Sequence, residues 1–259
     1  MDYFQAIVLG LIQGMTEWLP VSSKAMVSIS ARFLFGIEYR EALTSAIFLH
    51  SGTLVAAIAY FRGDLIKIAK SAFDKNSKKE LLVFLAIATA VTGLLGAPLL
   101  FIALNFEFPE WIFTLAIGLL LIGMAFLQKN KTGGTEKELR PKNALVAGFA
   151  QGLAGIPGIS RSGTTLAALL GEGYSLEDAM KLSFLMSIPA VMGVEFALPI
   201  LKGGFEVGPE LIAGSAVAGI VGFFTIDLLL KVAARPDFYK VTLSIGALVA
   251  VLGVALFFQ

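Results

Sequence analysis

Long apolar runs separated by short polar segments dominate the 259-residue sequence. Six runs approach the ~20 apolar residues that a helix needs to cross the hydrocarbon core of a bilayer. They cover 42–61, 81–104, 111–127, 184–201, 211–230 and 241–258. Glu195 and Asp227 are the only residues inside them that carry a formal charge. The pattern therefore predicts six transmembrane helices.

A soluble helical bundle is the alternative, and its helices would need polar faces that repeat every 3.6 residues. Run 81–104 reads LLVFLAIATAVTGLLGAPLLFIAL and has no such face. Only 15% of the residues are charged, against roughly 25% in a soluble domain, and the mean hydropathy is +0.83. We therefore expect an all-α integral membrane protein, with residues 1–259 forming a single membrane domain.

The positions of lysine and arginine predict the orientation of the chain. Loops 62–80 and 129–142 carry six and five basic residues, so the positive-inside rule makes both cytoplasmic. Segments 105–110 and 202–210 hold one lysine between them, whereas 231–240 holds three basic residues. The first two are predicted outside and the third inside, which leaves the C-terminus outside. We expect a multi-pass protein of the cell membrane.

Under this assignment, regions 1–35 and 143–180 each begin and end on one side of the membrane, outside for the first and inside for the second. Each region is either two full spans or a re-entrant helical hairpin. A polar break containing proline lies in the middle of each, and the helices after the breaks, Val27–Phe35 and Thr164–Leu170, are short. Non-helical backbone at membrane depth is tolerated where protein or a wet cavity surrounds it. These features favour two re-entrant hairpins.

The two regions also resemble each other in sequence. A shift of 138 residues aligns Gly10 with Gly148, Gln13 with Gln151, Gly14 with Gly152, and Ser22 with Ser160. FLHSGTLVA at 48–56 likewise resembles FLMSIPAVM at 184–192. Three predicted spans separate the hairpins, and an odd number inverts the second copy. We therefore predict an inverted-topology repeat, with halves 1–128 and 143–259 joined by cytoplasmic loop 129–142.

The first break carries several polar groups in an apolar stretch: Gln13, Glu17, Ser22, Ser23 and Lys24. Ionisable residues inside a membrane usually serve function and usually have a partner. The structural alternative is a Glu17–Lys24 ion pair, with Ser22 or Ser23 as the N-cap of the following helix. Lys24 is equally suited to bind a phosphate as a point charge.

The second break reads GIPGISRSGTT over residues 155–165. Glycines allow the backbone to approach a ligand closely, and the start of the following helix offers free N–H groups and a positive dipole end. Arg161 adds a planar fork of donors that matches phosphate oxygens. The combination predicts an oxyanion pocket. Its candidate ligands are Gly158, Ser160, Arg161, Ser162, Gly163 and Thr164.

Both breaks resemble signature motifs of one family. GLIQGMTEWLPVSS at 10–23 and PGISRSGTT at 157–165 are similar to the two motifs of undecaprenyl-diphosphate phosphatases of the bacitracin-resistance (BacA) type. HSGTLVAAIAYFR at 50–62 and FLMSIPA at 184–190 fit the pattern between them. The resemblance covers essentially the whole chain. It implies an inverted repeat with two re-entrant hairpins, and a hydrolase that removes the terminal phosphate of a polyprenyl diphosphate to recycle a lipid carrier for glycan assembly.

The resemblance also implies roles for individual residues. Glu17 matches the essential carboxylate of the first motif, Ser23 the proposed nucleophile and Arg161 the phosphate-binding arginine of the second motif. A serine needs a base or a metal to activate it, so Glu17 would act as that base or bind a divalent cation such as Mg²⁺ or Ca²⁺. Direct attack by water is the alternative to attack by Ser23. The other expected substrate ligands of the first break are Gln13, Ser22 and Lys24.

The chain departs from the bacterial motif at its end. That motif continues Ser-Ser-(Thr/Ser)-(Gly/Ala)-His, whereas residues 22–26 read SSKAM. Met26 cannot transfer a proton, and many family members have a carboxylate in place of Gln13. The pattern looks like an archaeal branch of the family, whose carrier would be a dolichyl-type lipid. His50, the only histidine, either replaces the missing one or is a hydrogen-bonded interior side chain.

Two further acidic residues lie inside predicted spans. Glu195 either lines the cavity or pairs with another helix, as intramembrane acids commonly do. Asp227 lies four residues before Lys231, so an ion pair along one helix face accounts for it.

The alternative function is a transporter or flippase of polyprenyl phosphates that uses the same anion pocket without hydrolysis. The chain has no cysteine, which excludes disulfides and thiol nucleophiles. A net charge of +1 gives no electrostatic reason to bind nucleic acid. The expected partners are the polyprenyl diphosphate and the membrane, and the sequence is compatible with a homodimer.

Overall fold

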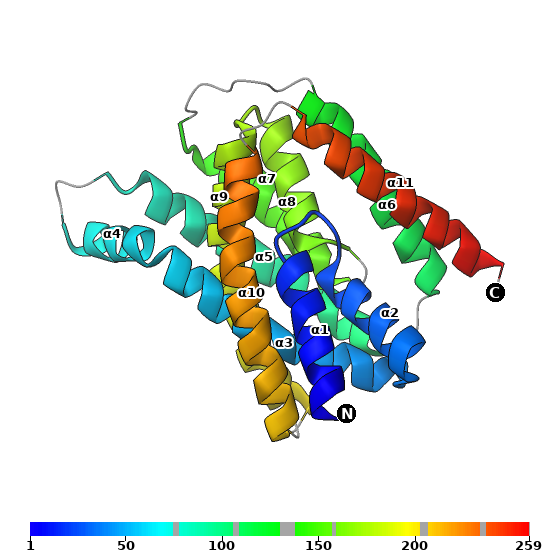
Figure 1. The fold of residues 1–259 in the computed structure, drawn as a ribbon. Coiled ribbons are helices and arrows are strands. Elements are labelled where there is room, and N and C mark those ends of the chain that lie inside the picture. Colours follow the sequence, from blue (N-terminus) through cyan, green and yellow to red (C-terminus); the bar gives the residue numbers. More distant parts are fainter. Residues whose placement is uncertain are drawn as a thin grey trace.

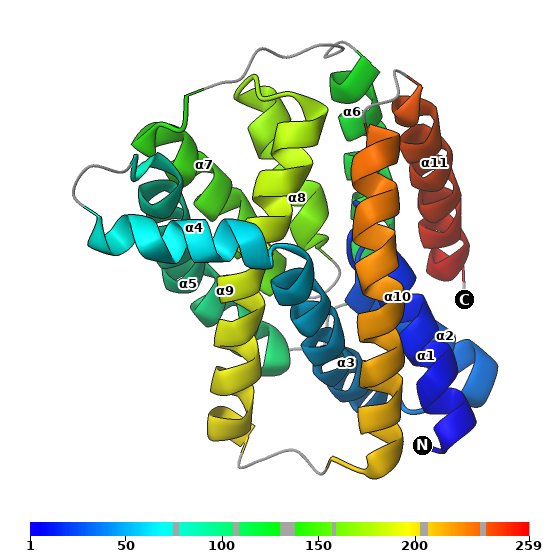
Figure 2. The same ribbon diagram turned by 60° about the vertical axis from the view of Figure 1, so that its left-hand side comes forward.

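The structure is a computed structural model that describes residues 1–74, 78–105, 109–129, 138–156, 159–202, 207–233 and 237–258. Regular structure within these ranges is helical (Figures 1 and 2). The elements are α1 (Tyr3–Thr16), α2 (Ser23–Phe35), α3 (Tyr39–Tyr60), α4 (Arg62–Phe73), α5 (Glu80–Asn105), α6 (Glu110–Lys129), α7 (Pro141–Gly152), the 3₁₀ turn η1 (Leu153–Gly155), α8 (Arg161–Gly171), α9 (Leu176–Lys202), α10 (Pro209–Ala233) and α11 (Phe238–Phe257).

The six predicted runs form helices α3, α5, α6, α9, α10 and α11. Four contain segments long and apolar enough to cross a membrane: Glu41–Tyr60, Glu80–Ile102, Leu176–Phe196 and Pro209–Val232. Among the described residues, the apolar stretches of α6 and α11 are shorter, Thr114–Gly123 and Tyr239–Ala255. An all-helical, multi-pass membrane protein is therefore confirmed, with four candidate spans.

Helices α3 and α9 lie at the centre of the bundle. Half of each of their apolar segments is buried, compared with 11% for α5 and 28% for α10. Helix α10 packs against α1 and α3, and α5 packs against α7. Helices α6 and α11 form a side-by-side pair at one edge of the bundle (Figures 1 and 2). The central helices are thus the ones placed to carry buried polar groups.

Figure 2 shows at which end of the bundle several helices begin and end, while their orientation in the membrane stays a prediction. The last residues of α6 and α10 lie at the top of Figure 2, and the N-terminus and the start of α10 lie at the bottom. The C-terminal ends of α6 and α10 therefore lie at the same end of the bundle. Most of loop 129–142 falls outside the described residues.

The regions around the two breaks contain short helices. Helices α1 and α2 have 14 and 13 residues, and α7 and α8 have 12 and 11. All four are shorter than the ~20 residues of a spanning helix. Helices α2 and α8 begin earlier than the sequence suggested, because Ser22 and Ser160 accept hydrogen bonds from the N–H groups of the first turns, as N-caps do.

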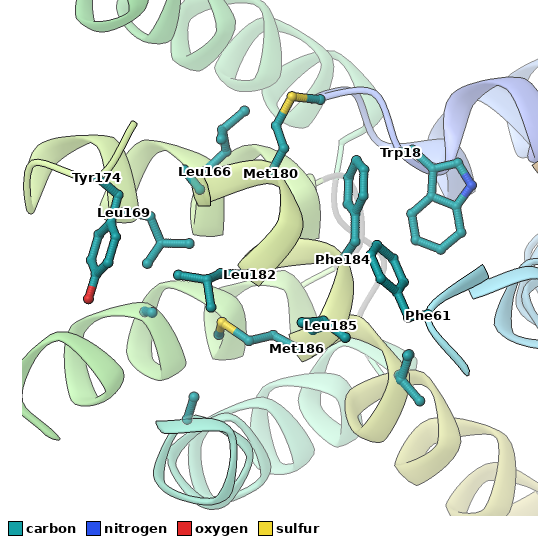
Figure 3. Close-up of a cluster of buried hydrophobic side chains, with 14 of the residues drawn as sticks. Trp18, Phe61, Leu166, Leu169, Tyr174, Met180, Leu182, Phe184, Leu185 and Met186 are labelled. Atoms are coloured by element: carbon teal, nitrogen blue, oxygen red, sulfur yellow. The ribbon is translucent and has the colours of Figure 1, made fainter. Parts of the chain in front are cut away.

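A cluster of large apolar side chains holds the breaks in place (Figure 3). Trp18, directly after Glu17, is 2% exposed and packs edge-on against Phe184 of α9, with ring centroids 5.1 Å apart. Leu166 and Leu169 of α8 belong to the same cluster. The two breaks are therefore fixed against one apolar core.

Glycine permits very close contact between α3 and α10. A Cβ on Gly52 would clash with the carbonyl oxygen of Ser215 and lie 3.0 Å from the backbone nitrogen of Gly219. Small residues at such crossings let helix backbones approach within a membrane. The Gly and Ala residues of 214–222 thus serve helix packing, as the sequence predicted.

We expect Gly52→Ala to destabilise the protein by about 1–3 kcal/mol, the usual cost of overpacking. The measurement is the midpoint of thermal unfolding in detergent. Gly123→Ala in α6 is the matched control, because its Cβ would meet nothing within 4 Å. Equal midpoints for the two variants would contradict the close α3–α10 contact.

Candidate functional site

The two breaks line one cavity of about 310 Å³. Glu17, Ser22, Ser23 and Lys24 come from the first break and from the start of α2. The start of α8 contributes Arg161 and Ser162. The remaining wall comes largely from α3, α5 and α9. Polar groups that are far apart in the sequence are thus collected at one place inside the bundle.

Glu17 is the centre of this polar cluster. The residue is only 4% exposed. Oε1 accepts a hydrogen bond from Arg161 Nη2 at 2.8 Å. Oε2 accepts from Gln13 Nε2 and from Ser23 Oγ, each at 2.7 Å, and lies 3.1 Å from His50 Nε2. Because a buried charge must be paired and hydrogen-bonded, these contacts are what allow the carboxylate to be buried here.

Arg161 has donors to spare. Nη2 bonds to Glu17, and Nη1 donates to the carbonyl oxygen of Ser183 at 3.3 Å. The guanidinium also lies 5.9 Å from the centroid of the Trp18 ring, a cation–π distance. A guanidinium carries five N–H donors. Donors beyond these two contacts are therefore left to bind an anion in the cavity.

Ser160 and Ser162 join the second break to the first. Ser160 Oγ donates to the carbonyl oxygen of Val21 at 2.9 Å, and Ser162 Oγ donates to that of Leu19 at 2.6 Å. Both acceptors belong to non-helical backbone, whose buried carbonyls need partners. In this structure the two hydroxyls therefore link the second break to the first. Their role as substrate ligands stays a prediction.

Other predicted ligands lie behind the cavity wall. The Gly163 N–H donates to Ser160 Oγ at 3.0 Å, and Thr164 Oγ1 donates to the Ser160 carbonyl at 3.0 Å. Gln13 is fully buried and reaches the site through Glu17. Gly158 lies outside the described residues. As placed, these residues support the groups that face the cavity.

Lys24 reaches the second break. Its Nζ donates to the carbonyl oxygen of Ala154 at 3.3 Å. Within the described parts of the chain, the ion-pair partners of Glu17 are Arg161 and His50. The Glu17–Lys24 ion pair that the sequence suggested as an alternative is therefore wrong. The Arg161 guanidinium and the His50 imidazole lie beside the Glu17 carboxylate instead.

Two helix N-termini point their first turns at the cavity. Ser22 is the N-cap of α2, as the sequence suggested, and accepts from the Ala25 N–H at 3.4 Å. Ser160 caps α8 in the same way. The positive ends of the two helix dipoles favour an anion between them. The polar end of the cavity is thus suited to phosphate.

His50 of α3 lies beside Ser23 and Glu17. Its Nε2 is 3.4 Å from Ser23 Oγ, and its Nδ1 lies 2.6 Å from the carbonyl oxygen of Ala46, one turn earlier in the helix. The imidazole is 12% exposed. The sequence left two alternatives for this residue, and the structure places a hydrogen-bonded interior side chain directly beside Ser23.

Glu195 of α9 also lines the cavity, so the first of its two alternatives is confirmed. Its Oε1 has no hydrogen-bond partner. Away from the cavity, Asp227 pairs with Lys231 at 2.6 Å, as expected. Sequence reasoning missed Gln151 as a lining residue, although its alignment with Gln13 in the repeat was a signal.

The cavity is apolar away from this cluster. Leu43 and Ile47 of α3 and Val191 and Val194 of α9 line it, together with Phe101 of α5. Binding sites of this kind combine an apolar wall with a few placed polar groups. The arrangement suits a ligand with an anionic head and a hydrocarbon tail.

Metal ligands are sparse in the described ranges. No group of three or more His, Cys, Asp or Glu side chains converges there on a point where an ion could sit. Glu17 therefore offers a carboxylate without a surrounding set of protein ligands.

Comparisons with known proteins agree with the motifs. The family model described as bacitracin resistance protein BacA matches residues 6–254. An undecaprenyl-diphosphatase of Methanococcoides burtonii is 41% identical over 254 residues, which cover 94% of this chain and 96% of the relative. A protein of the same name from Methanothrix thermoacetophila is 34% identical, and the match covers 95% of this chain and 95% of the relative. Another from Sulfurisphaera tokodaii is also 34% identical, with 98% of each chain covered. The chain belongs to the BacA family.

Proposed function

We propose that this protein hydrolyses undecaprenyl diphosphate, or a dolichyl-type equivalent, to the monophosphate and inorganic phosphate, and so recycles a lipid carrier for glycan assembly. The observation that carries the proposal is the cavity in which Glu17, Ser23 and Arg161 adjoin an apolar wall. A serine hydroxyl beside a carboxylate and an anion-binding arginine is a catalytic arrangement. The archaeal relatives named undecaprenyl-diphosphatase support the same activity.

In this proposal the substrate's diphosphate lies between the N-termini of α2 and α8. Arg161 binds phosphate oxygens and stabilises the charge that shifts as the phosphoryl group is transferred. The isoprenoid tail follows the apolar wall toward the lipid. Glu17 positions two groups, because it accepts hydrogen bonds from the Arg161 guanidinium and from the Ser23 hydroxyl.

Chemistry begins with attack of Ser23 Oγ on the terminal phosphorus. A bond forms between Oγ and phosphorus while the Ser23 proton passes to Glu17 Oε2, to which the hydroxyl donates. The bridging P–O bond breaks, and the polyprenyl monophosphate leaves with the bridging oxygen. Water then cleaves the phosphoserine and releases inorganic phosphate. Such covalent catalysis divides one difficult displacement into two easier ones. Direct attack by water is the competing route.

A divalent cation stays part of the proposal. Mg²⁺ is commonly held by one or two carboxylates together with substrate phosphates, and Glu17 offers a carboxylate at the polar end. The cation would neutralise charge on the diphosphate. The transport alternative has no support among the relatives named above.

We also propose the complete topology: six transmembrane helices, two re-entrant hairpins, and an inverted repeat of halves 1–128 and 143–259 within one membrane domain. Helices α1 and α7 begin at Tyr3 and Pro141, and α2 and α8 begin at Ser23 and Arg161, so one offset of 138 residues relates both pairs. In addition, α1 of the first half packs on α10 of the second, and α7 of the second half packs on α5 of the first. These reciprocal contacts support the symmetry. Loops 62–80 and 129–142 would be cytoplasmic and the C-terminus outside. A homodimer stays a prediction.

The first test is phosphate release from undecaprenyl diphosphate by the purified protein in detergent, with divalent cation present. Glu17→Gln and Arg161→Lys should each lower the rate by about 10²–10³-fold, as loss of preorganised charge does. Asp227→Asn is the control, because that acid is paired away from the cavity, and it should retain activity. A wild-type protein that releases no phosphate would overturn the proposed function.

The second test asks whether Ser23 is phosphorylated during turnover. Rapid acid quench of the reacting enzyme, followed by mass spectrometry, should detect phosphate on Ser23, since a phosphoserine ester survives acid. Ser23→Ala should lose the adduct and most of the activity. Full activity of Ser23→Ala would instead support direct attack by water.

Orientation can be measured by thiol labelling, because the chain has no cysteine of its own. Lys70→Cys on α4 and Val207→Cys before α10 each place one thiol at an exposed position. A membrane-impermeant maleimide added to intact cells should label Val207→Cys at once, and Lys70→Cys only after permeabilisation. The reverse pattern would invert the proposed topology.

A further inference from the structure

Helix α4 is short, charged and exposed, unlike the long apolar helices on either side of it in the chain. Its 12 residues extend about 18 Å at 1.5 Å per residue, too little to cross a hydrocarbon core of ~30 Å. None of its residues is buried. Figure 2 shows that α4 runs across the bundle, whereas α10 runs along it. Helix α4 therefore does not cross the membrane.

The bundle holds α4 by its first turn. Phe61, the N-cap of α4, is 2% exposed and belongs to the central apolar cluster shown in Figure 3. Leu65 packs against the same cluster, and Asp64 pairs with Lys181 of α9 at 3.1 Å. Figure 1 shows the helix at the outer edge of the bundle. The first turn thus fixes the direction in which the rest of α4 leaves the bundle.

Beyond the first turn, α4 has two exposed sides of opposite character. Ile66, Ala69 and Phe73 are spaced by three and four residues, so they form one apolar stripe along the helix. All three are exposed, Phe73 by 91% and Ile66 by 53%. Lys67 and Lys70, three residues apart, are exposed on the neighbouring side. A basic polar face beside an apolar one is typical of helices that lie in the plane of a membrane interface.

The lysines of α4 are available to bind an anion. Asp64, the only acidic residue of the helix, pairs with Lys181 outside it. Among the ion pairs of the described residues, none includes Lys67 or Lys70. Two more exposed lysines precede α5 at 78–79. Positive charge without an acidic partner therefore lies beside the apolar stripe.

The neighbouring helices keep α4 at the membrane surface. It follows the candidate span Glu41–Tyr60 and precedes the candidate span Glu80–Ile102. The short segment 61–79 must therefore leave the membrane and return to it on one side. A helix in such a segment stays near the lipid headgroups, so lipid is the occupant that its exposed stripe meets first.

We propose that α4 lies in the headgroup region of the cytoplasmic leaflet and binds anionic phospholipids. The apolar stripe enters the upper part of the acyl chains, and Lys67 and Lys70 bind phosphate oxygens of the headgroups. Anionic lipids of this leaflet attract basic residues next to the membrane, and buried apolar area adds to the attraction. The inference goes beyond the hydrolase and does not depend on it. The leaflet follows from the proposed orientation, which labelling of Lys70→Cys tests separately.

Lipid quenching of a fluorophore on α4 tests this inference. The chain has no cysteine, so Ala69→Cys supplies one thiol in the middle of the stripe. The full-length labelled protein is reconstituted in vesicles of phosphatidylcholine and phosphatidylglycerol, with a nitroxide on the acyl chain of one lipid or the other. We expect phosphatidylglycerol to be enriched about fivefold beside the fluorophore, the preference that corresponds to the attraction of one lysine. Salt at about 1 M should reduce the enrichment, because the Debye length falls to ~3 Å.

Two double variants, each made with Ala69→Cys, separate charge on α4 from the overall charge of the protein. Lys67→Gln with Lys70→Gln should remove the preference for phosphatidylglycerol and leave quenching by both lipids. Lys231→Gln with Lys240→Gln is the matched control, because it removes the same charge from α10 and α11 and should keep the preference. Thermal unfolding midpoints verify that both double variants fold.

Three outcomes would overturn the inference. Equal quenching by the two lipids before the lysines are changed would show no preference for an anionic headgroup. Equal loss of the preference in the control would assign it to overall charge. A fluorophore that aqueous iodide quenches and neither lipid reaches would place α4 in water, as a site for a soluble partner requires. The assay measures no phosphate release, so its result is independent of the hydrolase test.

Discussion

A buried ion pair between Glu17 and Arg161 joins two breaks that lie 144 residues apart. Removing one partner of such a pair leaves an uncompensated charge and typically costs 3–5 kcal/mol. The polar contacts around it follow from that constraint. Gln13, Ser23 and His50 complete the surroundings of the carboxylate, and Ser160 and Ser162 bind the carbonyls of the first break. The pair thus fixes the distance between the Ser23 hydroxyl and the Arg161 guanidinium.

The Glu17–Arg161 pair also bears on how the cavity would accept a second anion, the substrate's diphosphate. Arg161 holds a carboxylate in this structure, and its unused donors face a cavity into which two helix N-termini open. A diphosphate entering there adds negative charge beside Glu17, and the guanidinium and both helix dipoles offset the repulsion. The charge arrangement of the cavity is therefore close to the one that the proposed reaction needs, so little reorganisation is required.

Much of the fold could be predicted from the sequence because hydropathy is a local property. Runs such as 81–104 have no polar face, so they had to form buried or lipid-facing helices, and they do. The motifs likewise indicated Glu17, Ser23 and Arg161, which meet at one cavity. Contacts between distant segments could not be derived in this way. The partner of Lys24 is a backbone carbonyl 130 residues away, and no residue pattern specifies it.

His50 illustrates the same limit, because its position beside Ser23 depends on how α3 packs in the bundle. Position 26 lies on the face of α2 that meets Leu121 and Val249 of α6 and α11, so methionine adds apolar contact there. Ser23 donates to Glu17 of the first break, and α3 adds His50, which is oriented by its own helix through Ala46. A chain with this arrangement can lose the motif histidine without leaving Ser23 beside apolar groups only. The surroundings of Ser23 therefore depend on packing between helices, and the motif alone describes them incompletely.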